Sequence, residues 1–208
     1  MSRKNIAAIL NRANNAVGRI AGNLVPKYRP LDYFDPIQPK NLIGTQYAAF
    51  WLNSDFNKTL EYDFQYFKAQ LDSSNVLPGD IFVDTNATYL VVGSREAEGT
   101  NCIIVNDYLQ INRAFYGDSG AGFGSTHTPI ATNLPVNVMS MQGMPAVNVN
   151  PGHKSSQSHL LEYRIKTYFS DNLLKVGDQI INQSGYKSVI RSIEFGLLGY
   201  TLTCQEVK

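Results

Sequence analysis

Two distant stretches of the chain show the same order of polar and apolar positions. Residues 77–92 read LPGDIFVDTNATYLVV, and residues 176–190 read VGDQIINQSGYKSVI. Each has Gly-Asp, a short apolar run, a polar turn, a tyrosine and a return to apolar residues, which predicts a β-hairpin. Gly79 and Gly177 allow a sharp bend before the first strand, and we expect Asp80 and Asp178 to accept hydrogen bonds from nearby backbone amides.

Further alternating segments follow each hairpin, NCIIVNDYLQINR after the first and GYTLTCQEVK after the second. A hairpin alone is marginally stable, so each copy needs more strands to bury one face. The pattern predicts a mainly β fold with an N-terminal α-helix and two small antiparallel β-barrel or meander units, or two matching halves of one barrel. We place the first unit at residues 46–115 and the second at 160–208. Aromatic residues concentrated in 46–72 are interpreted as core of the first unit, in strand or loop.

The N-terminal segment has a helical period. Apolar residues of segment 4–24 recur at three- and four-residue steps on one face, and Lys4, Arg12 and Arg19 lie on the other. Pro26 ends the helix, so residues 1–25 form an amphipathic arm. Its apolar stripe needs a partner, which is either the body of the same chain or a neighbouring subunit. The contact residues predicted for this arm are Ile6, Leu10, Arg12, Val17, Arg19 and Ile20.

Two other segments are predicted to lack regular structure. Residues 26–45 hold several prolines and are interpreted as an extended linker. Residues 116–159 are rich in Gly, Ser, Thr, Asn and Pro, with almost no charge, which is typical of a long loop. Because its apolar residues alternate, we predict that it contacts another protein; a mobile loop is the alternative. The predicted contact residues are Val136, Val138, Met139, Met141, Val147 and Val149.

Composition narrows the function classes. Hydrophobic residues make up 43% of the chain, charged residues only 17%, and the net charge is +1, so no global field attracts nucleic acid or membrane. No apolar run reaches the ~20 residues of a membrane span, and no secretory signal is recognised, so a cytosol-like compartment is expected. The arginine-rich, acid-free start is also typical of an organelle transit peptide. Cys102 and Cys204 are predicted to be buried free thiols rather than a disulfide.

One short motif invites a catalytic interpretation. GDSG at residues 117–120 resembles the nucleophile loop of chymotrypsin-like serine proteases, in which a histidine and an aspartate precede the serine. Here His127, His153 and His159 all follow Ser119, so a hydrolase using Ser119 is only a remote alternative.

The sequence also lacks recognisable phosphate-binding and metal-binding motifs. The GAGFG run that follows lacks the Lys-Ser/Thr of a phosphate-binding loop, and the histidines lack metal-ligand spacing. We therefore predict no catalytic, cofactor-binding or metal-binding residue. The basic N-terminal arm allows weak, salt-dependent contact with DNA.

A family resemblance rests on four of these features. The short basic amphipathic helix, the YRP motif at Tyr28–Pro30 and the two Gly-Asp hairpins together resemble small structural proteins of tailed bacteriophages, of the head–tail connector, neck and head-completion type. The resemblance implies a non-enzymatic, ring-forming virion protein, assembled in the host cytoplasm. The implied partners are copies of itself and portal, connector or tail proteins, without a membrane. A tail, collar or baseplate location and a two-unit β-barrel adaptor that binds other proteins are the alternatives.

Overall fold

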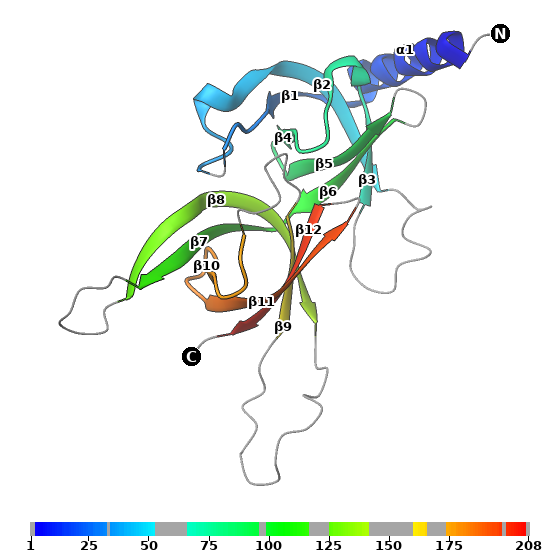
Figure 1. The fold of residues 1–208 in the computed structure, drawn as a ribbon. Coiled ribbons are helices and arrows are strands. Elements are labelled where there is room, and N and C mark those ends of the chain that lie inside the picture. Colours follow the sequence, from blue (N-terminus) through cyan, green and yellow to red (C-terminus); the bar gives the residue numbers. More distant parts are fainter. Residues whose placement is uncertain are drawn as a thin grey trace.

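The chain folds into two closed β-barrels in tandem, preceded by one helix (Figure 1). The computed structural model describes residues 3–32, 34–52, 66–95, 99–116, 125–141, 160–165, 174–196 and 199–206. The helix is α1 (Arg3–Ala21). The first barrel consists of β1 (Asn23–Tyr28), β2 (Leu42–Leu52), β3 (Tyr66–Gln70), β4 (Ile81–Val83), β5 (Thr88–Arg95) and β6 (Gly99–Val105). The second consists of β7 (Asp107–Tyr116), β8 (Ser125–Met141), β9 (Leu160–Ile165), β10 (Gln179–Ile181), β11 (Lys187–Gly196) and β12 (Gly199–Glu206).

The two barrels have the same topology. The strand order is β1-β2-β3-β6-β5-β4 in the first and β7-β8-β9-β12-β11-β10 in the second, with β4 closing onto β1 and β10 closing onto β7. All the pairings are antiparallel. The predicted mainly β fold, with an N-terminal helix and two barrel units related by a Gly-Asp hairpin repeat, is therefore confirmed.

The repeat extends to the register of individual residues. Cys102 in β6 and Cys204 in β12 each stand opposite the residue that begins a β-bulge, which shifts the register between Val91 and Gly93 in β5 and between Ile190 and Ser192 in β11. The cross-strand partners are Phe67 and Val91 for Cys102, and Leu161 and Ile190 for Cys204. Each strand of one barrel thus has a counterpart in the other.

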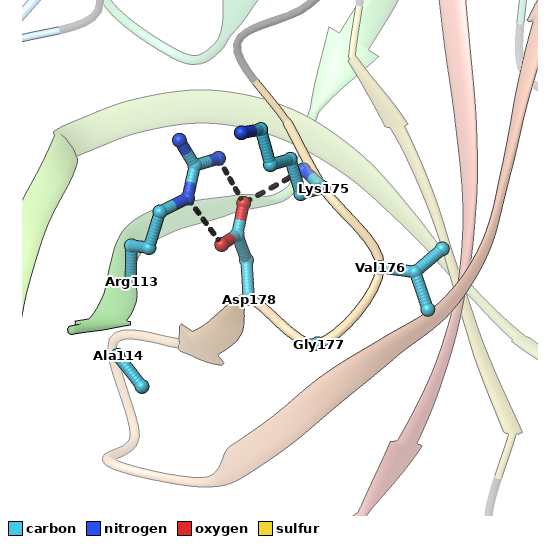
Figure 2. A pocket seen from close by; sticks show the side chains of 6 residues that line it. All are labelled: Arg113, Ala114, Lys175, Val176, Gly177 and Asp178. Atoms are coloured by element: carbon cyan, nitrogen blue, oxygen red, sulfur yellow. Dashed lines mark hydrogen bonds and ion pairs between the residues drawn. The ribbon is translucent and has the colours of Figure 1, made fainter. Parts of the chain in front are cut away.

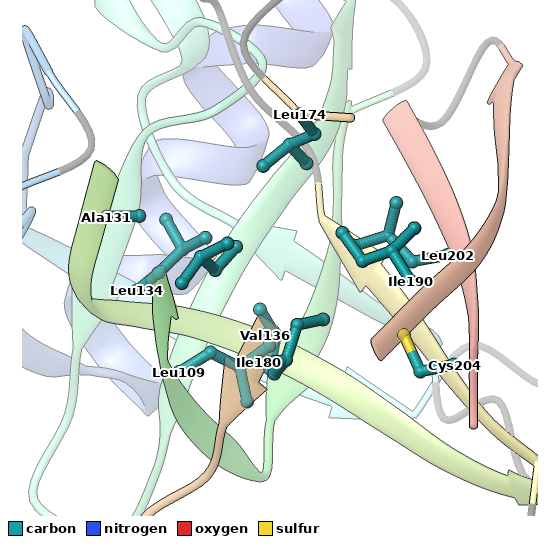
Figure 3. Packing of buried hydrophobic residues seen from close by; sticks show 10 residues of the cluster. Leu109, Ala131, Leu134, Val136, Leu174, Ile180, Ile190, Leu202 and Cys204 are labelled. Carbon is teal, nitrogen blue, oxygen red and sulfur yellow. The ribbon is translucent and has the colours of Figure 1, made fainter. Parts of the chain in front are cut away.

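Each barrel encloses its own apolar core. In the first, the ring of Tyr89 stacks on Phe50 with centroids 3.9 Å apart and meets the edge of Phe67 at 5.2 Å. Among the side chains that are described, the buried residues of the second core are aliphatic apart from one thiol (Figure 3), and they are Leu109, Ile111, Ala131, Leu134, Val136, Leu174, Ile180, Ile190, Leu202 and Cys204. Both cores come from the inward positions of alternating strands.

A further cluster lies on the outer face of the first barrel. Ile81, Leu90 and Ile103 are buried, although they alternate with the residues that point inward. The segment between β1 and β2, residues 29–32 and 34–41, is here called the strap, and its Ile37 packs on this outer cluster. The strap therefore covers a sheet face that would otherwise be exposed.

The strap also reaches the second barrel. The amide of Asp35 donates to the carbonyl of Thr132 at 2.8 Å, and Nδ2 of Asn133 donates to Oδ1 of Asp35 at 2.7 Å. Both Asp35 (φ 48°) and Asn133 (φ 50°) adopt the left-handed conformation, which Asp and Asn tolerate best after glycine.

The two barrels are joined by a single residue between β6 and β7, Asn106. Its Nδ2 donates to the carbonyl of Val138 at 2.8 Å, and its Oδ1 accepts from the amide of Val138 at 2.7 Å. Nearby, Nδ2 of Asn137 donates to the carbonyl of Ile104 at 2.9 Å. These bonds fix β8 against the end of the first barrel.

The strands differ from the predicted segment boundaries. The predicted linker 26–45 contains the second half of β1 and the start of β2, and the predicted loop 116–159 contains the whole of β8. The predicted first unit 46–115 includes nearly all of β7, which belongs to the second barrel. The rest of the predicted loop, residues 142–159, lies outside the described residues.

Prolines explain these differences. Pro26 lies within β1, and Pro129 and Pro135 lie within β8, although proline cannot donate a ladder hydrogen bond. The sequence pattern therefore suggests loops where tertiary pairing imposes strands. The predicted helix agrees closely with α1.

Candidate interaction surface

Each barrel contains one buried arginine–aspartate pair at the same position. Nε and Nη2 of Arg29 donate to Oδ1 and Oδ2 of Asp80 at 2.7 and 2.8 Å. Nε and Nη2 of Arg113 donate to Oδ1 and Oδ2 of Asp178 at 2.8 and 2.7 Å. The aspartates are buried, and the bidentate geometry is the strongest form of this contact.

The Gly-Asp motif positions these carboxylates. Gly79 (φ 93°) and Gly177 (φ 95°) have a backbone conformation that side chains rarely adopt, and each turns the chain into a short strand. Oδ2 of Asp80 also accepts from the amide of Leu77 at 2.9 Å, and Oδ2 of Asp178 from that of Lys175 at 2.8 Å. The predicted bends and hydrogen bonds are confirmed.

The two arginine–aspartate pairs each connect the first and fourth strands of a barrel, β1 with β4 and β7 with β10. Arg29 directly follows β1, and Arg113 lies in the equivalent part of β7. The hydrogen bond to Asp178 raises the pKa of the Arg113 guanidinium. Because both oxygens of each carboxylate accept strong hydrogen bonds, neither aspartate is placed to take a proton from a substrate.

A pocket of about 350 Å³ opens beside the second pair (Figure 2). It is lined by Arg113, Ala114, Lys175, Val176, Gly177 and Asp178. The carboxylate of Asp178 is directed at the Arg113 guanidinium and the Lys175 amide, and Val176 points away from the pair. Both oxygens of the Asp178 carboxylate in this lining already accept hydrogen bonds from Arg113 and the Lys175 amide, so the pocket is interpreted as the outer side of a structural ion pair.

The described part of the chain offers little other chemistry. Within it, no three His, Cys, Asp or Glu side chains gather as a metal site requires. Among the described residues, no helix combines the length and the apolar character needed to cross a membrane. His127 is exposed on β8, whereas Ser119, His153 and His159 lie outside the described residues.

Both cysteines are free and buried, as predicted. Burial raises the pKa of the Cys102 thiol strongly and that of Cys204 to about 12. The thiolate is the reactive form, so both side chains act as small apolar core residues.

The helix α1 is held on the first barrel by its polar side. Asn11 accepts hydrogen bonds at Oδ1 from the amide and the hydroxyl of Ser73, at 2.9 and 2.8 Å, and donates from Nδ2 to Oδ1 of Asp72 at 3.0 Å. The hydrogen bond from Asn11 lowers the pKa of the Asp72 carboxyl, and hydrogen bonds from Ser74 lower it further.

Two glycines allow the helix to approach the barrel closely. A Cβ atom on Gly18 would lie 2.5 Å from the carbonyl oxygen of Gln70, and one on Gly22 would lie 2.2 Å from that of Ala48. The backbone of α1 therefore packs directly on β2 and β3. Gly18 weakens the helix as such, whereas Gly22 directly follows its last residue, and both are required for its docking.

The apolar side of α1 faces solvent. We call this surface the outer stripe, and its residues are Ile6, Ile9, Leu10, Val17 and Ile20, with exposed fractions of 44, 51, 40, 36 and 85%. Arg12 and Arg19 are exposed beside it. Among the described residues, no acidic side chain forms an ion pair with either arginine.

The predicted arm residues all lie on this exposed side, which includes the outer stripe. The expectation that the body of the chain covers the apolar stripe is wrong, because the barrel binds the opposite, Asn- and Gly-containing side.

Four of the six predicted loop contacts belong to strand β8. Val136 is wholly buried in the second core, so it is not a contact residue, whereas Val138 is partly buried against the same core. Met139 and Met141 belong to β8, but their side chains are not described, and Val147 and Val149 lie outside the described residues.

Sequence reasoning missed the arginines and the helix anchor. Arg29 and Arg113 each end a run of alternating strand residues, in YR and NR, well before the Gly-Asp that they pair with. The sequence would reveal this arginine–aspartate pairing only if the repeat were extended upstream of the Gly-Asp hairpins to β1 and β7, so that Arg29 aligns with Arg113. Asn11 carries no local signal, because its partners come from the turn after β3.

Comparisons with known proteins give no family for this chain: no family model, curated protein or solved structure matches it significantly.

Proposed function

We propose that this chain is a non-enzymatic structural subunit that assembles with copies of itself through the outer stripe of α1. The observation that carries the proposal is the orientation of α1. Its polar side is bonded to the barrel through Asn11, and the apolar side is left in solvent. A helix held in this way presents a fixed surface, which lowers the entropy cost of binding a partner.

The free energy available from this surface is substantial. Fully burying an aliphatic side chain of this size contributes roughly 1.5–3 kcal/mol. The five residues of the outer stripe are already partly covered, with exposed fractions between 36 and 85%, so the gain that remains ranges from about a third at Val17 to most of it at Ile20. Removing this area from water in a partner interface is a sufficient driving force for assembly.

Closed barrels favour assembly by surface patches. In both barrels the described strands pair around a full circuit, which leaves no free edge for strand addition. A helix arm that extends from a rigid pair of barrels provides the contact instead.

The setting we favour is the neck of a tailed bacteriophage particle, as a ring-forming head–tail connector. This part of the proposal rests on the resemblance of the basic helix, YRP and the Gly-Asp hairpins to such proteins. A subunit of the tail, collar or baseplate is the alternative, because it would also assemble through an exposed surface. In a particle, portal or tail proteins would contact the ring, and the basic residues of α1 would lie near DNA.

Light scattering after size exclusion, with negative-stain imaging, tests the proposal. The wild-type chain is expected to form a ring-shaped oligomer as its concentration rises, and Leu10→Asp with Ile20→Asp is expected to remain monomeric. Ala8→Asp is the matched control, since Ala8 is exposed on α1 outside the outer stripe.

Two outcomes would contradict assembly through α1. One is a wild-type chain that stays monomeric at every concentration, alone and with the other proteins of the particle. The other is an oligomer that Leu10→Asp with Ile20→Asp leaves intact.

A further inference from the structure

The first barrel carries a second exposed apolar surface. Its residues, here called the strap patch, come from the strap and the first two positions of β2. They are Leu31, Phe34, Leu42 and Ile43, with exposed fractions of 74, 44, 44 and 43%. The two segments meet at their base, because the amide of Arg29 donates to the carbonyl of Asn41 at 2.8 Å. The strap patch thus presents large apolar side chains where the strap and β2 join.

The strap patch and the outer stripe lie at opposite ends of β1. The helix α1 leads into β1 at Asn23, and the strap leaves it after Tyr28. Six extended residues span about 20 Å. Figure 1 shows α1 and the segment between β1 and β2 on opposite sides of the first barrel. One copy cannot bring its own two surfaces together, whereas two copies placed head to tail can.

The two surfaces differ in charge. The helix carries Arg3, Lys4, Arg12 and Arg19 with no acidic residue. The strap carries two acidic residues, Asp32 and Asp35, and two basic ones, Arg29 and Lys40, and Arg29 is paired with Asp80. The Asp32 side chain is 42% exposed, with Lys40 3.0 Å away. Such an exposed ion pair contributes little, so Asp32 is free to exchange its partner. Two outer stripes placed together would instead bring arginines near arginines without a carboxylate.

We propose that the outer stripe of α1 in one copy docks on the strap patch of the next copy, with Arg12 and Arg19 facing the exposed carboxylate of Asp32. This inference rests on the proposed function and names the surface that receives the helix. Because the two surfaces differ, the contact is heterologous, and its repetition gives a ring when the rotation closes and an open filament when it does not.

The strap is held in place by contacts with both barrels, which suits it to bind a helix. It is fixed to the first barrel by Ile37 and to the second by the hydrogen bonds of Asp35 with Thr132 and Asn133. A docking surface that bridges both barrels transmits the contact to the whole subunit. The strap connects β1 to β2, and the equivalent β7–β8 segment of the second barrel lies outside the described residues.

Complementary charge reversal tests the contact. One variant combines Arg12→Glu with Arg19→Glu, and the other carries Asp32→Lys; Asp35 is left unchanged because it holds Asn133. Each variant alone is expected to assemble at least about tenfold more weakly than wild type, since each contact then joins like charges. An equimolar mixture of the two is expected to recover assembly with alternating subunits, as is one chain that carries all three changes.

Matched controls separate charge from fold. Arg191→Glu reverses an exposed arginine of the second barrel that bonds to Gln205, and it is expected to assemble like wild type. Asp32→Asn removes the charge but keeps an acceptor for the amide of Phe34, and it should weaken assembly less than Asp32→Lys. Circular dichroism confirms the fold of each variant.

The failures are distinguishable. If wild type assembles but Asp32→Lys is neutral, or if the chain that carries all three changes does not recover assembly, the strap is not the receiving surface, although α1 can still mediate assembly elsewhere. If wild type never assembles, both the inference and the proposed function are wrong.

Discussion

Lys27 and Ile111 occupy the same register position in the two barrels. Lys27 of β1 pairs with Phe82 of β4, and Ile111 of β7 pairs with Ile180 of β10. Ile111 is wholly buried in an aliphatic core. Lys27 is equally enclosed, and its Nζ donates to the carbonyl of Asn75 at 2.8 Å and to Oε1 of Gln46 at 3.3 Å.

Replacing Lys27 by Ile is expected to change the free energy of unfolding by no more than about 1 kcal/mol at neutral pH, because exchanging a buried charge for an apolar side chain is often neutral. The carbonyl of Asn75 keeps a donor, Nη2 of Arg29 at 3.2 Å. Chemical denaturation measures the difference. A loss as large as that of a cavity-forming core substitution would show that the ammonium group is essential to the first barrel.

The same variant has a pH signature. Burial lowers the pKa of the Lys27 ammonium below 10.5. The unfolded chain then binds more protons than the folded chain between the lowered pKa and 10.5, so wild-type stability should rise with pH across this window. Lys27→Ile should lack that rise. Parallel denaturation curves of the two proteins at neutral and alkaline pH provide the comparison.

Arg29→Met is expected to destabilise the first barrel by about 3–5 kcal/mol, since it leaves the buried carboxylate of Asp80 without its cation. Lys40→Met is the matched control: it removes a cation from the exposed pair with Asp32, and its cost should stay below about 1 kcal/mol. The midpoint of urea unfolding is the measurement. Equal effects of the two substitutions would contradict a structural role for the buried pair.

The sequence predicted the repeated hairpins, the helix and the buried thiols because each depends on local periodicity. It did not predict β1 or β8, whose prolines suggest loops, since their strand conformation depends on pairing with distant residues. The boundary at Asn106 was missed for the same reason: β6 and β7 follow each other almost without a break in pattern. The apolar face of α1 was predicted from its helical spacing, but the docking role of Gly18 and Gly22 was not, because only the carbonyls of β2 and β3 reveal it.

Gly18→Ala is expected to loosen α1 from the barrel. Alanine favours an isolated helix by about 1 kcal/mol over glycine, yet its Cβ would lie 2.5 Å from the carbonyl oxygen of Gln70. Hydrogen exchange of the α1 amides should therefore become faster while the barrel amides remain protected. Gly93→Ala is the control, because a Cβ there meets nothing within 4 Å. Slower exchange in Gly18→Ala would mean that helix propensity outweighs the close approach.

Acidification is expected to release α1 before the barrels unfold. The hydrogen bonds from Asn11 and Ser74 lower the pKa of Asp72 below 3.8, so the folded state favours the carboxylate. A lowered carboxyl pKa contributes stability that is complete above 3.8 and is lost as the pH falls from there through the folded-state pKa. Exchange of the α1 amides, corrected for its intrinsic pH dependence, should accelerate in this range in wild type. Asp72→Asn has an acceptor oxygen at every pH, so it should show little such acceleration, and an identical pH response in both proteins would exclude Asp72 as the acid-sensitive anchor of the helix.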